Sequence, residues 1–434
     1  MFRTAKASAL FALAGLLGCA SDSTPVPPGP TGEVAASSKQ RVLSPRLGGT
    51  DLADVVSGNA TFAFDLYRSL RAESGNLFFS PHSISLALAM AHAGARGGTE
   101  QELAKALHFT LPQGALHAAM NALDLELARR GEAAKGKSGR PFRLNVANAA
   151  WGQKGYDFDA SYLDTLAENY GAGVRLVNFR DQPEPSRVTI NDWVAGKTND
   201  KIKDLLPEGA VTDLTRLVLT NAIYFNAAWE DKFDPAQTRR DEFVTADGKT
   251  VMAPMMSKTY HYGHGKDGGA EAVELAYDGQ ELSMLLVRPE TGSFSDFEAR
   301  FDDKALSALL RRVQPTMVEL HLPKFRIEGA LGLKKQLQAL GMQQAFSGAA
   351  DFSGILGRKE LYISDVLHKA FVAVDEAGTE AAAATAVVMA GSAQVDPVRV
   401  FFNRPFLFLV RDKQTGAILF LGRVLDPTAE SIRR

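Results

Sequence analysis

Residues 376–405 read EAGTEAAAATAVVMAGSAQVDPVRVFFNRP, and this stretch decides how the rest of the chain is interpreted. Four consecutive alanines alone favour a helix, because alanine has the highest intrinsic helix propensity. The flanking runs, Phe371 to Asp375 and Val398 to Phe402, are instead rich in the β-branched and aromatic residues that favour strands. A small-residue segment between two strands is therefore predicted to be an exposed loop that can later become a strand itself.

The same stretch resembles the hinge and reactive-centre loop of the serpin family. The resemblance extends over residues 51–427 and is one of whole-domain architecture, which is more specific than a single motif. Five further blocks follow in the order that the family has: 76–109 (beginning NLFFSPHSISLALAM), 219–233 (LTNAIYFNAAWEDKF), 318–346 (beginning VELHLPKFRIEGAL), 366–385 and 402–427.

The order of apolar and turn-forming segments predicts an α+β protein. Strands and helices come in blocks without regular β-α-β alternation. The nearly continuous apolar run from Leu217 to Phe225 predicts a central strand buried on both faces. Asp247-Gly248, Asp278-Gly279 and Thr415-Gly416 each lie between β-rich runs and predict hairpins. The resemblance implies the serpin fold for residues 51–428: three β-sheets, a helical cluster, and an exposed reactive-centre loop at about 376–401 that can insert into the central sheet.

The N-terminus has the layout of a secretory signal. Arg3 and Lys6 precede an apolar run from Ala7 to Leu17, which is too short to remain as a membrane-spanning helix. The following Leu-Leu-Gly-Cys19 resembles a bacterial lipobox, which implies a lipoprotein signal peptide over residues 1–18 and lipidation of Cys19. An ordinary signal peptide with an accidental cysteine is the alternative. We expect an exported protein anchored by lipid at the outer membrane or cell surface, or alternatively secreted.

Residues 19–50 are rich in Pro, Gly, Ser and Thr and show no apolar periodicity. Such a composition buries too little apolar surface to offset the entropy of ordering, so a flexible tether is predicted.

Bulk composition excludes some functions. The 434 residues are 45% hydrophobic and 23% charged, which is ordinary for a globular protein with a sizeable core. The net charge of −2 gives no reason to expect a nucleic-acid partner. Cys19 is the one cysteine, so no internal disulfide can form. We expect a monomer without a cofactor.

Common enzyme and metal-binding motifs are absent from the sequence. Gly-x-Ser-x-Gly, Ser-x-x-Lys and His-Glu-x-x-His do not occur, so an enzyme is not expected. Residues 263–268 match Gly-x-Gly-x-x-Gly, but a strand-like run follows where a dinucleotide site needs a helix, so a hairpin loop is predicted. His261 and His264 have no third ligand nearby in the sequence, and no metal site is expected.

The resemblance implies an irreversible suicide-substrate inhibitor of a serine protease. Cleavage of the loop would let it enter the central sheet as an extra strand, trapping the acylated protease. In a strand, Thr379, Ala381, Ala383 and Thr385 would share one uncharged face, and Glu380 would lie on the other. A non-inhibitory serpin that acts as a chaperone or carrier is the alternative. The implied hinge consists of Glu376, Gly378, Thr379, Glu380, Ala381, Ala382, Ala383, Ala384 and Thr385.

Hinge spacing typical of the family puts the reactive bond between Ser392 and Ala393, with Met389 and Gly391 as alternates. No Arg or Lys occurs between Glu376 and Pro397. The expected target is therefore elastase-like or subtilisin-like and not trypsin-like.

Three further groups of residues are assigned by the resemblance. Ser80, Ser83, Asn191 and His368 match a hydrogen-bonded shutter beneath the central sheet, and Trp229 matches the breach where the loop enters. A lone histidine in an apolar strand is otherwise a satisfied core residue, and His368 is interpreted as a hydrogen-bonding latch in either case. Basic residues from Arg129 to Arg143 lie where some relatives bind polyanions, although acidic and glycine residues interrupt them and favour a plain solvated helix exit.

Overall fold

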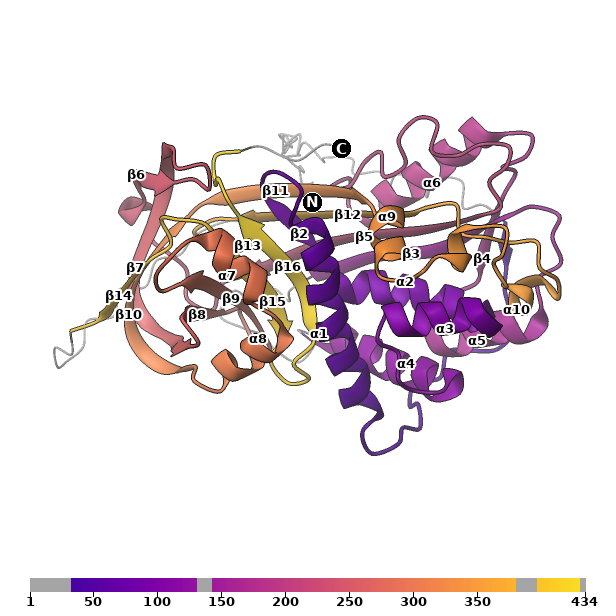
Figure 1. The fold of residues 1–434 in the computed structure, drawn as a ribbon, viewed down its shortest axis with the longest axis horizontal. Helices are drawn as coiled ribbons and strands as arrows, with labels where there is room; N and C mark the ends of the chain where they lie inside the picture. Colours follow the sequence, from indigo (N-terminus) through magenta and orange to yellow (C-terminus); the bar gives the residue numbers. More distant parts are fainter. Residues whose placement is uncertain (1–32, 131–142, 380–395, 430–434) are drawn as a thin grey trace, which may run out of the picture.

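The computed structural model describes residues 33–130, 143–379 and 396–429 of the chain. Long strands run along the length of the molecule, and most helices from the N-terminal third gather near one end (Figure 1). The predicted signal peptide, Cys19, and the reactive-bond candidates Met389, Gly391, Ser392 and Ala393 lie outside the described residues.

The first sheet has seven strands among the described residues, in the order β1-β4-β3-β5-β13-β12-β11. Its strands are β1 (Val34–Ala35), β3 (Arg143–Gln153), β4 (Val174–Val177), β5 (Leu217–Ala228), β11 (Phe325–Gly332), β12 (Val366–Val374) and β13 (Gly378–Thr379). The prediction of a central buried strand over 217–225 is confirmed: β5 lies in the middle of the sheet, and its first nine residues are all buried.

The second sheet has nine described strands. Eight follow the order β14-β10-β7-β8-β9-β15-β16-β2, and β6 pairs with β7. They are β2 (Leu77–Phe79), β6 (Arg239–Val244), β7 (Thr250–Asp267), β8 (Ala270–Ala276), β9 (Leu282–Pro289), β10 (Gln314–Pro323), β14 (Val398–Phe401), β15 (Phe406–Asp412) and β16 (Ile418–Val424). Strands expected in three sheets thus form two hydrogen-bonded sheets, because the 18-residue β7 continues from one group of strands into the next.

Helices cover both faces of the seven-stranded sheet. α2 packs against β3 and β5 on one side, and α6 packs against β3 on the other (Figure 1). No helix in the described ranges is long and apolar enough to span a bilayer. The α-helices are α1 (Asp51–Leu70), α2 (Pro81–Gly94), α3 (Gly97–Ala106), α4 (Gln113–Arg129), α5 (Ala160–Tyr170), α6 (Pro183–Lys197), α7 (Phe294–Arg300), α8 (Asp303–Leu310), α9 (Lys334–Ala339) and α10 (Ser353–Leu356); Pro235–Gln237 and Gln344–Phe346 are short 3₁₀ turns.

α2 is buried along its whole length, which its sequence explains. Apart from His82 and His92, its residues are apolar or small on every side, as expected for a helix inside the core. The helix begins where Ser80 accepts a hydrogen bond from the backbone N–H of Ser83 at 3.2 Å, with Pro81 in the first turn. This cap fixes the two serines directly under the central strands.

The hairpin predictions are confirmed. Gly248, Gly279 and Gly416 all have positive φ, and they lie in the turns that join β6 to β7, β8 to β9 and β15 to β16. The segment 263–268 spans the end of β7 and the turn into the antiparallel β8, so it forms a hairpin and not a dinucleotide loop.

The prediction of a flexible tether over residues 19–50 is wrong for residues 34–42. Val34–Ala35 adds an edge strand to β4. Further along, Lys39 pairs with Asp164 at 3.2 Å, and Arg41 pairs with Asp124 at 2.5 Å. Composition and hydrophobic periodicity do not predict these contacts. The contacts depend on a two-residue edge strand and on ion pairs of Lys39 and Arg41 with acidic residues far along the chain.

Candidate functional site

The described end of the predicted hinge lies inside the seven-stranded sheet. β13 is inserted between β5 and β12 and runs antiparallel to both. Thr379 lies opposite Ala227 of β5 and Val374 of β12. The hinge residues from Glu380 to Thr385 lie outside the described residues.

Thr379 is completely buried, and its hydroxyl is 2.7 Å from the hydroxyl of Tyr277. Burial raises the pKa of Tyr277 well above its ordinary value, so its hydroxyl stays protonated and can donate or accept. The Tyr277 ring stacks on the indole of Trp229, with centroids 4.7 Å apart and planes 11° from parallel. The Thr379 side chain thus points into the interior, where it contacts the stacked pair of Tyr277 and Trp229 through the Tyr277 hydroxyl.

Trp229 follows directly after β5 and holds the chain that leads to the hinge. Its indole N–H donates to the carbonyl of Asp375 at 2.9 Å, and its backbone N–H donates to the carbonyl of Ala377 at 3.0 Å. A tryptophan in this position combines apolar stacking with a hydrogen bond to the segment that leads to the hinge.

Glu376 is anchored by side chains from other elements. Lys324 donates to it at 2.7 Å, and the Thr238 hydroxyl donates at 2.7 Å. Burial acts to raise the pKa of the Glu376 carboxyl, but the hydrogen bonds from Lys324 and Thr238 outweigh burial and lower it. The carboxylate is therefore charged at neutral pH and holds the start of the hinge.

Gly378 is required by the close approach of the hinge to β5. Its φ is 151°, a conformation that side-chain-bearing residues rarely adopt. A Cβ atom at this position would lie 2.2 Å from the carbonyl oxygen of Ala227.

Just beyond Thr379, β5 and β12 pair directly with each other. The pairing is parallel and covers six positions, from Val366 opposite Leu219 to Phe371 opposite Tyr224. The two strands are therefore separated by β13 at one end and paired directly with each other over the positions from Phe371 to Val366. Any further insertion must open these six pairs.

A buried hydrogen-bonded cluster joins the two closed strands to α2. The backbone N–H of Ser80 donates to Nε2 of His368 at 3.1 Å, so the proton of the neutral imidazole lies on Nδ1 and is donated to Oδ1 of Asn221. Burial lowers the pKa of His368 to about 3, which keeps the ring neutral. His368 lies directly opposite Asn221 in the sheet register.

The cluster continues through two more side chains. The Asn221 amide donates to Ser83 Oγ at 2.6 Å and to Asn148 Oδ1 at 2.6 Å, and Ser83 Oγ donates to Asn148 Oδ1 at 3.1 Å. We call Ser80, Ser83, Asn148, Asn221 and His368 the shutter cluster.

The assignment of Asn191 to this cluster is wrong. Asn191 is on α6, across the sheet, where its amide donates to the Leu206 carbonyl at 2.9 Å and its Oδ1 accepts from the Leu206 N–H at 2.8 Å. Asn148 and Asn221 were the missed residues. The available signal for Asn221 was a polar residue at the centre of the apolar run of β5.

The far end of the predicted loop is anchored in the other sheet. β14 pairs in parallel with β10, with Val398 opposite Val318. The described residues that flank the predicted loop, Thr379 and Val398, therefore belong to different sheets.

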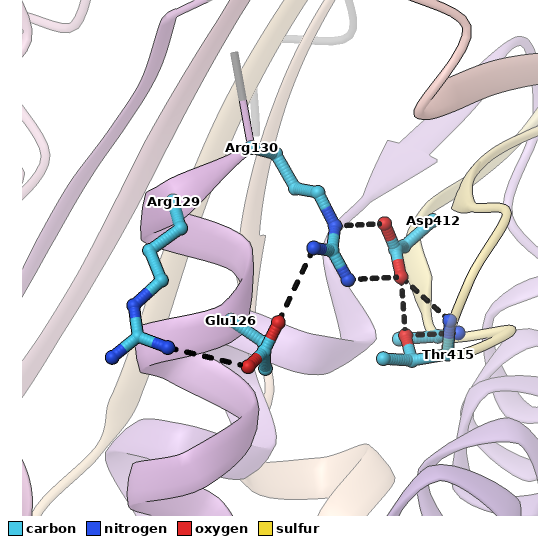
Figure 2. Close-up of polar contacts among 6 residues, drawn as sticks. Glu126, Arg129, Arg130, Asp412 and Thr415 are labelled. Atoms are coloured by element: carbon cyan, nitrogen blue, oxygen red, sulfur yellow. Dashed lines mark hydrogen bonds and ion pairs between the residues drawn. The ribbon is translucent and has the colours of Figure 1, made fainter. Parts of the chain in front are cut away.

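The basic residues at the end of α4 are engaged by acidic groups (Figure 2). Arg130 donates through Nε and Nη2 to the fully buried carboxylate of Asp412, at 2.8 and 3.4 Å. Arg130 also contacts Glu126 at 3.2 Å, and Arg129 contacts the same glutamate at 3.4 Å. Thr415 donates two further hydrogen bonds to Asp412. Arg130 thus holds the interior together and is not available to a polyanion.

The described residues contain no group of three side chains suited to a metal ion. His264 contacts Glu271 at 3.0 Å. His261 is exposed and lies three positions away on β7, so its side chain is on the opposite face of the strand. The arrangement allows a conformational change: β13, which already lies between β5 and β12, could be extended if the hydrogen bonds of the shutter cluster opened.

Comparison with known proteins assigns this architecture. The family model "Serpin (serine protease inhibitor)" matches residues 57–427. A serpin-like protein of Thermococcus kodakarensis is 39% identical over 376 residues, covering 86% of each chain. The leukocyte elastase inhibitor of Bos taurus is 37% identical over 382 residues, covering 86% of this chain and 99% of the relative.

A solved structure agrees with the sequence comparisons. The thermophilic serpin tengpin in its native state matches with a TM-score of 0.78 and 28% identity, covering 89% of this chain and 97% of that one. The predicted fold class is thereby confirmed.

Proposed function

This chain belongs to the serpin family, and we propose that it is an irreversible suicide-substrate inhibitor of an elastase-like or subtilisin-like serine protease. The protease serine oxygen would attack the carbonyl carbon of Ser392 and form an ester there. The peptide bond breaks, and the amine of Ala393 leaves. Insertion of the cleaved loop between β5 and β12 would then trap the ester before water hydrolyses it.

One observation carries the proposal. β13 is antiparallel to both of its neighbours, whereas β5 and β12 below it pair in parallel. Extending β13 replaces one parallel ladder with two antiparallel ladders. Antiparallel pairing is slightly more stable per residue, and the added strand also brings new backbone hydrogen bonds. The inserted form is therefore expected to be lower in free energy than the uncleaved one.

The register supports a fit along the whole path. Continuing the pairs that Thr379 makes with Ala227 and Val374 by six residues brings Thr385 opposite both Asn221 and His368. These positions lie on the same face as Thr379, because strand side chains alternate. A threonine hydroxyl would thus enter the shutter cluster at the point where the His368–Asn221 hydrogen bond is broken.

The target class follows from the loop sequence. Met389, Gly391, Ser392 and Ala393 are small or uncharged, and the stretch from Glu376 to Pro397 contains no Arg or Lys. A relative named leukocyte elastase inhibitor supports the same class. Mass analysis of the fragment released by elastase, subtilisin and trypsin would identify both the bond and the protease class. Cleavage by trypsin alone within 376–401 would contradict the proposal.

We also propose that the protein acts outside the cytoplasm. Cleavage after residue 18 and lipidation of Cys19 would place the folded domain at the outer membrane or cell surface, and the unlipidated alternative is a secreted protein. Mass spectrometry of the mature N-terminus tests this, since an unmodified N-terminus other than Cys19 would contradict it.

Insertion is tested by placing a charge on the buried face. Thr379→Arg should turn the inhibitor into a substrate, because a guanidinium in the place of the Thr379 hydroxyl would be buried without a partner. Glu380→Arg is the matched control, because alternation along an inserted strand would place that side chain on the opposite face. Denaturant-resistant complexes with elastase are measured on gels. Unchanged complex formation by Thr379→Arg would refute insertion, and absence of complexes with every protease would favour the chaperone or carrier alternative.

A further inference from the structure

The last residue of β14 is held by a charged side chain from another part of the second sheet. Arg288 of β9 donates through Nη1 to the carbonyl oxygen of Phe401 at 2.9 Å, and its guanidinium lies 6.0 Å from the centroid of the Phe402 ring. Phe401 ends β14, and Phe406 begins β15, the strand that pairs with β9. Arg288 therefore contacts the chain where it leaves the edge strand and turns into the middle of the sheet.

A buried carboxylate on the neighbouring strand holds Arg288 in place. Glu271 of β8 lies directly opposite Arg288 in the register of the sheet and is 2% exposed. Its Oε2 accepts from Nε and Nη2 of Arg288, at 3.0 and 2.6 Å. Two hydrogen bonds from one planar guanidinium fix its orientation, so that Nη1 points at Phe401.

Glu271 is held in turn by two side chains of β7. His264 donates through Nε2 to Oε1 of Glu271 at 3.0 Å, and the Lys266 ammonium lies 3.3 Å from the same oxygen. Burial acts to raise the pKa of Glu271, but the hydrogen bond from His264 and the charge of Arg288 outweigh burial and hold the pKa at about 2. The carboxylate is therefore charged at neutral pH, and three strands together set the position of Arg288.

β14 is a short edge strand that gains from such a tie. It has four residues and pairs with β10 alone among the described strands. Its polar and aromatic contacts with Glu319 and His321, through Arg399 and Phe401, also go to β10. The bond from Arg288 adds a connection from β14 to strands on the other side of the sheet.

Release of β14 matters if the loop inserts as proposed above. Thr379 already lies in the first sheet, whereas Val398, 19 positions further on, lies in the second. Every residue that enters the first sheet shortens the uncleaved chain that is left to reach Val398. Cleavage of the loop removes this limit, and detachment of β14 would remove it without cleavage.

We propose that Glu271 and Arg288 form a clasp on the end of β14, which keeps the uncleaved loop from inserting before a protease has cut it. The inference rests on the proposed inhibitory function and names a further control of the same loop. Arg288 is a positioning residue, because it contacts the flank of the loop and not the bond that is cut.

Hydrogen exchange in the uncleaved full chain tests the hold on β14 directly. Arg288→Met removes the bond to Phe401, so the amides of Val398–Phe401 should exchange about tenfold faster, the factor that corresponds to about 1.4 kcal/mol. Lys266→Gln is the matched control: Lys266 contacts Glu271 and Glu290, and its replacement should change exchange in β14 less than twofold. Unchanged exchange in Arg288→Met, or an equal increase throughout β8, β9 and β15, would overturn the clasp.

A double variant covers the case in which Arg288→Met fails to fold because Glu271 loses its counter-charge. Glu271→Gln combined with Arg288→Met removes both charges and keeps similar side-chain volumes, and it still lacks the bond to Phe401. The exchange of β14 amides should increase in the double variant as well. An exchange rate equal to that of the parent would overturn the proposal.

The consequence for inhibition is measured by storing the uncleaved protein at 37 °C and titrating it against elastase at intervals. Arg288→Met should match the parent in the number of protease molecules trapped at time zero, and its active form should decay about tenfold faster. Faster exchange in β14 with an unchanged decay would overturn the role of the clasp in insertion. If the parent traps no protease, the proposed function fails, while a rise in melting temperature on storage still reports insertion: an equal rate of that rise in Arg288→Met and parent would overturn the clasp by itself.

Discussion

His368→Ala should destabilise the uncleaved protein far more than an ordinary histidine replacement. The change removes the acceptor of the Ser80 N–H and the donor to Asn221 Oδ1, and the Ser80 and Asn221 residues are both fully buried. Each buried group left without a partner costs about 1–3 kcal/mol, so the free energy of unfolding should fall by about 2–6 kcal/mol. At about 2 °C per kcal/mol for a domain of this size, Tm should fall by about 4–12 °C.

The loop-cleaved form should respond less to the same substitution. A strand inserted between β5 and β12 moves them from about 4.8 Å to about 9.6 Å apart, so His368 and Asn221 no longer bond directly. The substitution should therefore lower the free energy of unfolding less in the cleaved form than in the uncleaved form. Its spontaneous conversion to an inserted form should be faster than that of the parent protein.

Thermal unfolding of both forms, before and after cleavage with elastase, measures this difference. His261→Ala is the matched control, because His261 is exposed on β7 and should change Tm little. The reasoning would be refuted if His368→Ala unfolded within about 1 °C of the parent, or if its Tm fell equally in the cleaved and uncleaved forms.

Three further outcomes are expected from the same structure. Burial lowers the pKa of His117 and His368 to about 3, so below pH 6.5 the unfolded chain takes up protons that the folded chain does not; urea unfolding should show full stability above pH 6.5 and a loss of about 2 kcal/mol per histidine at pH 5. Gly378→Ala should displace the hinge, because its Cβ would lie 2.2 Å from a β5 carbonyl oxygen, and elastase should cut the variant faster while hydrogen exchange at β13 increases. Asp412→Asn should cost about 3–5 kcal/mol in urea unfolding by removing the buried counter-charge of Arg130 and leaving it only the partly exposed Glu126, and adding Arg130→Met should recover part of that loss.

Patterns within one segment predicted the fold well. β5 was expected from its apolar run and the hairpins from their glycine-containing turns, since both signals are local. The hinge was expected to present Thr379 to the interior, and alternation along one strand suffices for that. These features depend on neighbouring residues and little else.

Partners far apart in sequence were harder to predict. His368 and Asn221 are 147 positions apart, and only the register between β5 and β12 brings them together. A resemblance supplied His368 but selected Asn191, an asparagine on the other side of the sheet. Tyr277 was missed for the same reason, because its contact with Thr379 spans 102 positions.

The direct pairing of β5 with β12 suggests what an inserting strand would have to open. The direct pair nearest to Thr379 joins Tyr224 to Phe371, whose rings lie 6.3 Å apart on the face opposite to the shutter cluster. The Arg326 guanidinium lies over the Phe371 ring, 4.8 Å from its centroid.

If the proposed insertion occurs, an advancing strand would meet two latches in turn, an aromatic pair on one face and then the His368–Asn221 hydrogen bond on the other. Insertion would have to break the contacts of each latch before new ladder hydrogen bonds form. The barrier to insertion would thus come from closed side-chain contacts between β5 and β12, while the gain would come from the backbone pairing that follows.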